Sequence, residues 1–554
     1  MNISAANQTK IIKLATDVNF FGKRLRDKKL EVCDAISKEV FGTAKHSSEI
    51  CDWLEANRPV KPSTAKRERI AKEDNRPLTA GALNSAVETW KVKQGKRFLL
   101  TSAQNNTDVH ANFLQTLEVA AKHLNAELLV SKFLYNKNGF QNGEGAKGIH
   151  FDPRLEKYFL TENVFLNSRE SNFAFMAEIN ILPTATFPLS GFAETAVAFG
   201  LDGLAIGHAK ISAESVAALK GETVRRMYST GTVTTKNYIQ QKAGQKAEAL
   251  HNYGALLVEF DDNGVFYVRQ IESMDASGAF YDLTDLYTVD GVKHGQNVLG
   301  LQYGDIHAEK IDEDCAAASW GVGGLVDVLK PKYQLIHDVH DFTSRNHHNR
   351  NSGVFLASQY AQGRDKVLQD IKDTGKILQN MERDFSQTVV IESNHDLALA
   401  RWLDDPKCNV KQDPANAALY YKLNAALYAA IESGDETFNV LSYAIQEVAG
   451  YDVAAIFLET DQSLKLAGIE CGMHGHNGIN GARGNPKGFM KLGKANTGHT
   501  HTPSIYGGVY TAGVAGSLDM GYNIGASSWS QTHIITYPNG QRTLIDFKAG
   551  KFYA

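Results

Sequence analysis

Residues 298–307 read Val-Leu-Gly-Leu-Gln-Tyr-Gly-Asp-Ile-His, and this stretch decides the fold expected for the C-terminal half. Apolar residues dominate its first six positions, as in a short buried strand, and Asp305 and His307 follow directly. On an extended chain, residues i and i+2 point to the same face. The stretch therefore predicts a carboxylate and an imidazole that enter one cavity at the end of a strand.

The same arrangement recurs along the chain. Strand-like runs at 333–336 and 388–391 each precede a polar cluster, and two histidine pairs follow. Each cluster is weak evidence alone, but the ordered set predicts one two-metal site. Mixed imidazole, carboxylate and amide ligands suit Mn²⁺, Fe²⁺ or Zn²⁺ better than Ca²⁺ or a structural zinc. The four further clusters are His337-Asp338-Val339-His340-Asp341, Ser393-Asn394-His395-Asp396, His474-Gly475-His476 and Gly498-His499-Thr500-His501.

In order and spacing, these clusters resemble the motifs of the calcineurin-like metallophosphoesterases, D-x-H, GD-x-x-D, GNH-D/E, H and GH-x-H. The resemblance covers roughly residues 296–545 and implies a β-sandwich flanked by helices. It also implies two divalent metal ions, with Mn²⁺ expected first and Fe²⁺, Zn²⁺ or Mg²⁺ as alternatives. The implied ligands are Asp305, His307 and His501 on one metal, Asn394, His474 and His499 on the other, and Asp338 as the bridge.

The chemistry of such a site is hydrolysis of a phosphoric ester. Two divalent ions about 3.5–4 Å apart activate water and neutralise charge on a phosphoryl group. The resemblance makes His395 the catalytic acid for the leaving oxygen, a role worth about 10²–10⁴-fold in rate. It also implies that Asp341 orients this histidine.

The chain departs from the family pattern at several positions. His337 and Ser393 stand where glycines usually precede the second and third motifs, so both turns must accept a side chain. Phe342 replaces the arginine that protein phosphatases carry after the second motif, which argues against phosphoprotein phosphatase activity. Isolated histidines often satisfy a core hydrogen bond, so we expect His340, His347, His348, His476 and His533 to be bystanders or supports. Candidate substrate contacts are Arg345, His347, His348 and Arg350.

Length and composition predict an α/β protein of several domains. A chain of 554 residues is too long for one core, and 43% hydrophobic with 22% charged residues is ordinary for a globular protein. We expect neither a membrane span nor a secretory signal. Five scattered cysteines indicate reduced thiols and a cytoplasmic location. The expected regions are a basic helical region at 1–94, an α/β accessory domain at 95–295 and a dimetal domain at 296–554.

Charge is distributed unevenly along the chain. Residues 1–100 hold 20 Lys+Arg against 12 Asp+Glu, although the whole chain carries a net charge of −4. A basic end on an acidic body suggests a polyanionic partner, and a solvated helix face explains the pattern equally well. Two short helices before the break at 59–64 are compatible with a helix-turn-helix. The basic positions are Lys23, Arg24, Arg26, Lys28, Lys29, Lys61, Lys66, Arg67, Arg69 and Lys72.

The middle region alternates strands and helices. A strand at 97–101, a helix at 108–124 and a strand at 127–130 form a βαβ order, which favours a parallel sheet. The sequence Gly143-Glu144-Gly145-Ala146-Lys147-Gly148 fits GxGxxG but lacks a strand before it, so we expect a loop. The stretch 229–251 is rich in hydroxyl residues, glycine and lysine, and predicts either a phosphate-binding loop or a structural hairpin. Further strands are expected at 201–206, 255–260 and 265–268, and a long helix near 354–383.

The whole chain also resembles metallophosphoesterase-type proteins of tailed bacteriophages, in particular the early-expressed protein with which one siphophage group destroys host DNA. This resemblance implies Mn²⁺-dependent cleavage of DNA in the host cytoplasm, by a catalytic domain similar to break-repair nucleases. A small-molecule or cyclic-nucleotide phosphodiesterase or phosphatase is the alternative enzyme. A non-catalytic DNA-binding host-takeover protein is the alternative of another class. A homo-oligomer and a host or phage protein partner remain open.

Overall fold

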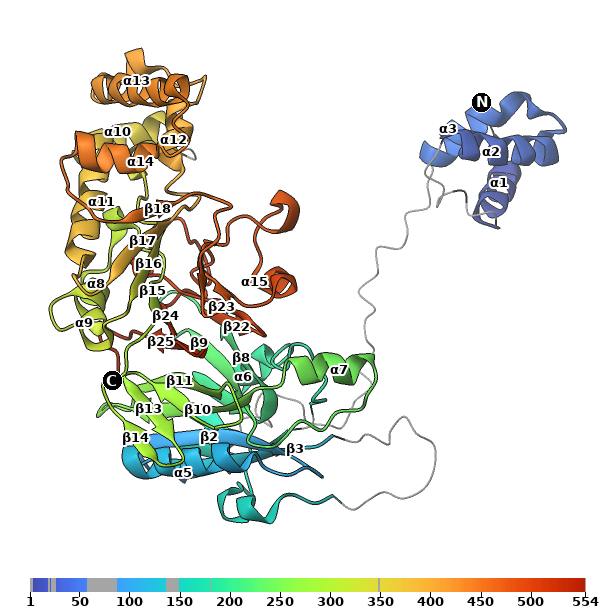
Figure 1. Ribbon diagram of the computed structural model, residues 1–554. Helices are drawn as coiled ribbons and strands as arrows, with labels where there is room; N and C mark the ends of the chain where they lie inside the picture. Colours follow the sequence, from blue (N-terminus) through green and yellow to red (C-terminus); the bar gives the residue numbers. More distant parts are fainter. Residues whose placement is uncertain are drawn as a thin grey trace. The chain divides into compact units, whose positions relative to one another are not determined.

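The computed structural model describes residues 3–17, 20, 26–56, 87–135, 149–179, 181–346 and 349–553. The chain divides into two compact units, Met1–Thr79 and Ala80–Ala554. Large sheets and many helices confirm a mixed α/β fold (Figure 1). Within the described ranges, no helix has both the length and the apolar character needed to cross a membrane.

The first unit is helical. In its described residues, three α-helices pack through apolar side chains that include Ile11, Cys33, Ile36, Ile50 and Leu54, which confirms the helical pattern expected there. Lys29 forms an ion pair with Glu55, whereas Lys23, Arg24 and the basic positions from 61 to 72 lie outside the described residues. Contact with nucleic acid therefore stays a prediction. The helices are α1 (Ala5–Asp17), α2 (Arg26–Phe41), η2 (Ala44–His46) and α3 (Ser47–Ala56).

A six-stranded sheet carries the first three motifs of the second unit. Its order is β18-β17-β16-β15-β24-β25, with β15 to β18 parallel and β24 antiparallel to β15. Three of its strands confirm the runs expected at 298–303, 333–336 and 388–391. Parallel neighbours end at the same sheet edge, so the polar clusters that follow them meet there. The strands are β15 (Gly300–Gln302), β16 (Tyr333–His337), β17 (Gln387–Ile391), β18 (Ile456–Leu458), β24 (Thr532–Thr536) and β25 (Arg542–Asp546).

Helices cover one face of this sheet and share a large apolar core with it (Figure 1). The single long helix expected near 354–383 is wrong, because the chain forms two helices there. Gly363 takes a φ of 68° after the first helix, and the N–H of Val367 donates to Asn416 Oδ1 at 2.8 Å at the start of the second. The helices are α8 (Glu313–Trp320), α9 (Leu325–Leu329), α10 (Gly353–Ala361), α11 (Val367–Met381), α12 (Ala398–Leu403), α13 (Ala417–Ser433) and α14 (Val440–Tyr443), with short turns η5 (Ala308–Lys310), η6 (Thr343–Arg345), η7 (Val410–Gln412) and π-helical η8 (Ala444–Val448).

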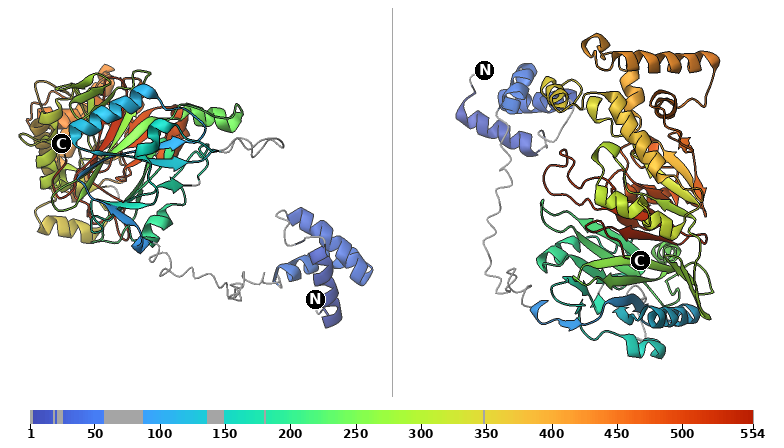
Figure 2. Two further views of the ribbon diagram at one scale, coloured as in Figure 1. Left: turned by 90° about the horizontal axis from the view of Figure 1, so that it is seen from below. Right: turned by 90° about the vertical axis from the view of Figure 1, so that its left-hand side faces the viewer.

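A five-stranded sheet, ordered β11-β10-β2-β3-β6, forms the accessory region. The βαβ prediction is confirmed because β2 and β3 are parallel and α5 (Ala111–Leu124) connects them, although β10 joins β2 in antiparallel register. Figure 2 shows α5 across the outer face of this sheet. The strands are β2 (Arg97–Gln104), β3 (Glu127–Phe133), β6 (Glu178–Ile179), β10 (Tyr253–Phe260) and β11 (Phe266–Ser273), and a small sheet holds β12 (Phe280–Asp282), β13 (Asp285–Thr288) and β14 (Gly291–Lys293).

An eleven-stranded sheet joins the accessory and C-terminal regions. Its order is β1-β4-β5-β7-β9-β8-β22-β23-β21-β20-β19. Residues 91–93, placed by the sequence at the end of the helical region, form β1. The sheet has strands on both sides of residue 295, and the domain boundary there stays a prediction. The strands are β1 (Lys91–Lys93), β4 (Val164–Leu166), β5 (Phe173–Phe175), β7 (Gly203–Ile206), β8 (His208–Val216), β9 (Arg225–Gly231), β19 (Lys465–Leu466), β20 (Ile469–Glu470), β21 (Ala495–Thr497), β22 (Ser504–Tyr506) and β23 (Val509–Thr511).

The remaining short helices lie on the connections between these strands. They are α6 (Ala193–Ala198), α7 (Lys242–Ala249), α15 (Pro486–Phe489), η4 (Pro153–Tyr158), η9 (Ile479–Gly481) and η10 (Met490–Leu492). Apolar side chains from the eleven-, five- and six-stranded sheets share one core. The sheets therefore stack against each other, and the helix-covered six-stranded sheet holds the candidate site.

Candidate metal centre

The predicted first-metal residues gather at the carboxyl edge of the six-stranded sheet. Asp305 and His307 follow β15, Asp338 follows β16, and His501 follows β21 of the neighbouring sheet. All four residues are at most 4% exposed. One ligand atom from each lies within 4.8 Å of the others. Tertiary structure thus places in one cluster the residues that the resemblance assigned to one ion.

The imidazoles of His307 and His501 face each other within this cluster. Their Nε2 atoms are 3.0 Å apart, and His501 Nε2 is 2.9 Å from Asp305 Oδ2. His307 Nδ1 lies 2.9 Å from Asp341 Oδ1. A carboxylate can only accept a hydrogen bond, so the proton is on Nδ1. Neutral His307 therefore presents a lone pair at Nε2. A lone pair aimed at another ring and at carboxylates is the donor arrangement that a divalent cation needs.

The second predicted set supplies buried atoms that lack a hydrogen bond. Asp338 Oδ1, Asn394 Oδ1 and His474 Nε2 have no hydrogen-bond partner among the described residues. His474 Nε2 and Asp338 Oδ1 are 3.4 Å apart, and the His474 and His499 ring centroids are 5.1 Å apart. A buried polar atom without a partner costs about 1–3 kcal/mol. Three such atoms from one predicted ligand set fit a second ion, and their ligand role stays a prediction.

The backbone of the site is held in an unfavourable conformation. His307, Asp338, His499 and His501 have φ values of 52°, 49°, 70° and 54°, in the left-handed region that side chains other than glycine rarely adopt. Each such residue costs on the order of 1–3 kcal/mol and persists only where the surroundings enforce it. Four predicted ligands in this state indicate a site built for geometry rather than stability.

His395 and Asp341 form the pair that the resemblance implied. His395 Nδ1 lies 3.1 Å from Asp341 Oδ1, and Lys310 Nζ lies 2.6 Å from Asp341 Oδ2. Burial opposes a charge on His395, but the charge of Asp338 and the hydrogen bond to Asp341 outweigh it and raise its pKa to about 10. The imidazole is 19% exposed, so this side of the site is open to a reactant.

His337 stands where the family usually has a glycine, and it links the two predicted ligand sets. Its Nδ1 is 2.7 Å from Asp305 Oδ1 and 3.2 Å from His474 Nδ1, and its Nε2 accepts from Gln302 Nε2 at 3.1 Å. Burial lowers its basicity, yet the charge of Asp305 raises the pKa above the ordinary value. The only signal in the sequence was its place beside Asp338.

Two small residues explain how the turns accept their neighbours. Ser393 stands at the other position where the family usually has a glycine. Its Oγ accepts hydrogen bonds from the N–H groups of His395 and Asp396 at 3.2 and 3.0 Å, so its side chain closes the turn. A Cβ on Gly498 would lie 2.1 Å from His337 Cε1 and 2.4 Å from Asp305 Oδ1. Glycine is therefore required at position 498.

The predicted substrate contacts are less accessible. Arg345 forms a two-pronged ion pair with Asp413, with Nε and Nη2 each 2.7 Å from a carboxylate oxygen, and Arg350 pairs with Asp405. His347 and His348 lie outside the described residues. Their contact with substrate stays a prediction.

The expected bystander histidines differ among themselves. His533 accepts from the Gly304 N–H and contacts Ser319 Oγ, and His340 Nδ1 contacts Thr374 Oγ1. His476 has two ring nitrogens without a partner, and its ring is 5.4 Å from that of His474. His476 therefore borders the candidate metal centre.

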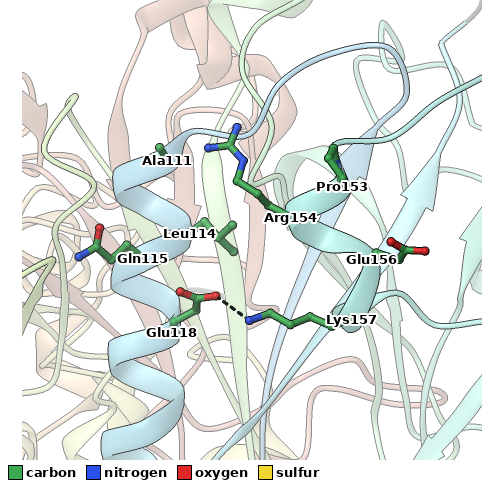
Figure 3. Close-up of a pocket in the computed structure, with 8 residues that line it drawn as sticks. All are labelled: Ala111, Leu114, Gln115, Glu118, Pro153, Arg154, Glu156 and Lys157. Atoms are coloured by element: carbon green, nitrogen blue, oxygen red, sulfur yellow. Dashed lines mark ion pairs between the residues drawn. The ribbon is translucent and has the colours of Figure 1, made fainter.

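An open surface pocket of about 770 Å³ lies elsewhere, between α5 and η4 (Figure 3). Both of its basic side chains are already paired, with Lys157 3.3 Å from Glu118 and Arg154 2.7 Å from Asp152. None of the predicted ligands lines it. The buried histidine and aspartate cluster is therefore the candidate functional site.

Comparison with known proteins provides a family. The chain is 71% identical over 558 residues to Protein A1 of Escherichia phage T5, with 100% of both chains covered. The chain belongs to the protein A1 family. This relative supports the predicted bacteriophage origin of this A1-family member. No family model matches the chain, and no solved structure matches it.

Proposed function

We propose that this A1-family protein is a two-metal phosphodiester hydrolase that cleaves DNA in the host cytoplasm. The observation that carries the proposal is the buried cluster of possible ligand atoms, in which Asp338 Oδ1, Asn394 Oδ1 and His474 Nε2 have no hydrogen-bond partner among the described residues. Asp305, His307, Asp338 and His501 would hold one ion, and Asn394, His474 and His499 would complete a second site with Asp338. The donor set of nitrogen and oxygen atoms suits Mn²⁺.

The side chains around the ions have separate roles in the proposed reaction. A pair of divalent ions, when bound, makes water acidic enough to act as a nucleophile and neutralises charge on the phosphoryl group. His395, on the exposed side of the cluster, donates a proton from Nε2 to the leaving oxygen while Asp341 holds Nδ1. Lys310 and Thr343 in turn fix the other oxygen of Asp341, so the imidazole keeps one orientation.

DNA is the proposed substrate for two reasons. Residues 1–100 carry an excess of basic side chains, which lowers the free energy of binding to a polyanion. The protein is also related to a bacteriophage protein over its whole length. Arg345 and Arg350 remain proposed substrate contacts, reached only if substrate displaces Asp413 and Asp405.

A small-molecule phosphodiesterase or phosphatase is the second candidate. The burial of the site favours this candidate. Seven residues of the site are each at most 4% exposed: Asp305, His307, His337, Asp338, Asp341, His474 and His501. A buried site is reached by a small diester or a strand end more readily than by an intact duplex. A non-catalytic host-takeover protein is disfavoured, because it would have no need of a complete ligand set.

The test is incubation of the purified protein with linear and circular duplex DNA, in Mn²⁺, Mg²⁺ or EDTA. We expect cleavage that requires metal and disappears in Asp338→Asn. Attack on circles would identify an endonuclease. Intact DNA together with rapid hydrolysis of bis-para-nitrophenyl phosphate would replace the proposal with the small-molecule enzyme.

A further inference from the structure

The segment 517–529 presents apolar side chains beside the metal centre. Tyr522 is 49% exposed, Ile524 is 88% exposed and Leu518 is 45% exposed. Neither Tyr522 nor Trp529 belongs to an apolar core cluster of the described residues. These rings therefore contribute little to the core, and the exposed face of Tyr522 is available to another molecule.

Contacts on both sides tie this aromatic pair to the site. The Trp529 ring centroid is 4.1 Å from that of His501 and 5.7 Å from that of Tyr522. On the other side, Lys310 Nζ lies 5.0 Å from the Tyr522 centroid and 2.6 Å from Asp341 Oδ2. The rings are thus fixed next to a predicted metal ligand and next to the residue that orients the proposed acid.

The position and chemistry of these rings select the ligand. A strand whose phosphate lies at the metal centre carries its bases a few ångströms away, and aromatic side chains stack on bases of any sequence with about 1–3 kcal/mol per base. A base inside a duplex already stacks on both neighbours. Only an unpaired or terminal base offers a free face to Tyr522.

We propose that Tyr522 and Trp529 form a stacking platform for an unpaired nucleobase next to the phosphate held at the metal centre. This inference rests on the proposed function and narrows its substrate to single strands, gaps and frayed ends. Lys310 supports the platform through its contact with the Tyr522 ring and does not itself meet the base.

The platform can be tested by binding two ligands of equal charge. We would measure the affinity for a twelve-nucleotide oligothymidine and for an abasic strand of the same length, both in a His395→Ala background that slows cleavage. The platform predicts that the protein binds oligothymidine about 5- to 150-fold more tightly than the abasic strand. Tyr522→Ala should remove most of that preference, and Tyr522→Phe should keep it because the ring remains.

A matched control is available on α13. Tyr428 is 63% exposed and contacts none of the metal-centre residues, so Tyr428→Ala should leave the preference unchanged. Metal content of Tyr522→Ala, equal to that of the parent, would show that the site is intact. With the active protein, Tyr522→Ala should raise KM for single-stranded DNA more than it lowers kcat.

The outcomes separate the platform from the nuclease. Metal-dependent DNA cleavage with no preference for bases over an abasic strand would overturn the platform and leave the nuclease standing. A preference that Tyr522→Ala retains would also overturn it, since the base would then stack elsewhere. Absence of DNA cleavage by the unmodified protein would overturn the nuclease itself.

Discussion

Two groups of histidines in the second unit differ in what their ring nitrogens contact. His208 and His251 in the accessory region have both nitrogens satisfied. His208 accepts from the Lys210 N–H and donates to the Leu182 carbonyl, and His251 contacts Tyr238 Oη and the Thr234 carbonyl. In the candidate metal centre, His474 Nε2 and His501 Nδ1 have no partner among the described residues, and His307 Nε2 faces another imidazole.

The difference separates structural histidines from candidate ligands. A buried polar atom is normally hydrogen-bonded, so a satisfied ring belongs to the fold, and a cluster of unsatisfied rings indicates a ligand that completes them. The hydroxyl-rich stretch 229–251 follows the first pattern, because Ser229, Thr230 and Thr232 donate to main-chain carbonyls. These contacts favour a structural role over a phosphate-binding loop, but the predicted hairpin is wrong, because the stretch holds the end of β9, a connection and helix α7.

The largest expected effect comes from the proposed bridging carboxylate. Asp338→Asn removes the charge that both sites would share, so we expect hydrolysis to fall by at least about 10³-fold and metal content to fall with it. Metal analysis and cleavage rate would be measured on the same preparation. Normal activity with normal metal content would show that the cluster, like the accessory histidines, is structural and does not bind metal.

Removal of the proposed acid should affect rate without affecting metal content. We expect His395→Ala to keep its metals and to cleave about 10²–10⁴-fold more slowly, with the larger loss for poor leaving groups. Rates for a nucleotide diester and a nitrophenyl diester provide the measurement. An equal loss with both substrates would contradict a role in protonating the leaving oxygen.

His337 tests the link between the two ligand sets. Since it contacts Asp305 and His474, His337→Ala should weaken metal affinity or activity by about 10- to 100-fold, as loss of a residue that orients ligands does. His251→Ala is the control from the accessory region, where we expect unchanged metal affinity in the folded protein. Equal metal affinities in both variants would show that the histidines of the two regions do not differ in their contribution to metal binding.

We expect the smallest effect from the accessory histidines, on the pH dependence of the unfolding free energy. Burial, with the charge of Lys210 or Lys236, lowers the pKa of His208 and of His251 to about 3. The unfolded chain binds a proton on each below about pH 6.5, and the folded chain does not until about pH 3. Each histidine should therefore lower the unfolding free energy by about 1.4 kcal/mol between pH 7.5 and 5.5.

Denaturation in EDTA at the two pH values measures this effect without bound metal. His251→Ala starts from a lower stability because it loses two hydrogen bonds, so the comparison is between the pH dependences and not between the absolute values. We expect a smaller loss on acidification in the variant than in the parent. The same pH dependence in both proteins would mean that His251 is accessible to protons when folded.

Local sequence was sufficient for the strands and for the order of the candidate ligands. Short apolar runs before Asp305, Asp338 and Asn394 predicted β15, β16 and β17, because strand formation in a buried sheet depends on neighbouring residues. The long helix near 354–383 failed for an equally local reason, the left-handed turn at Gly363. The role of Arg345 was not predictable, since its partner Asp413 is 68 residues away.

By itself, the sequence determined which residue types recur at strand ends, and therefore a candidate metal site and a mixed α/β fold. Only the tertiary structure decided that His337 stands between Asp305 and His474, that Trp529 and Tyr522 border the site, and that strands before and after residue 295 share one sheet. Those facts depend on contacts between segments far apart in the chain. No periodicity or spacing within one segment encodes such contacts, because they arise from how the sheets pack.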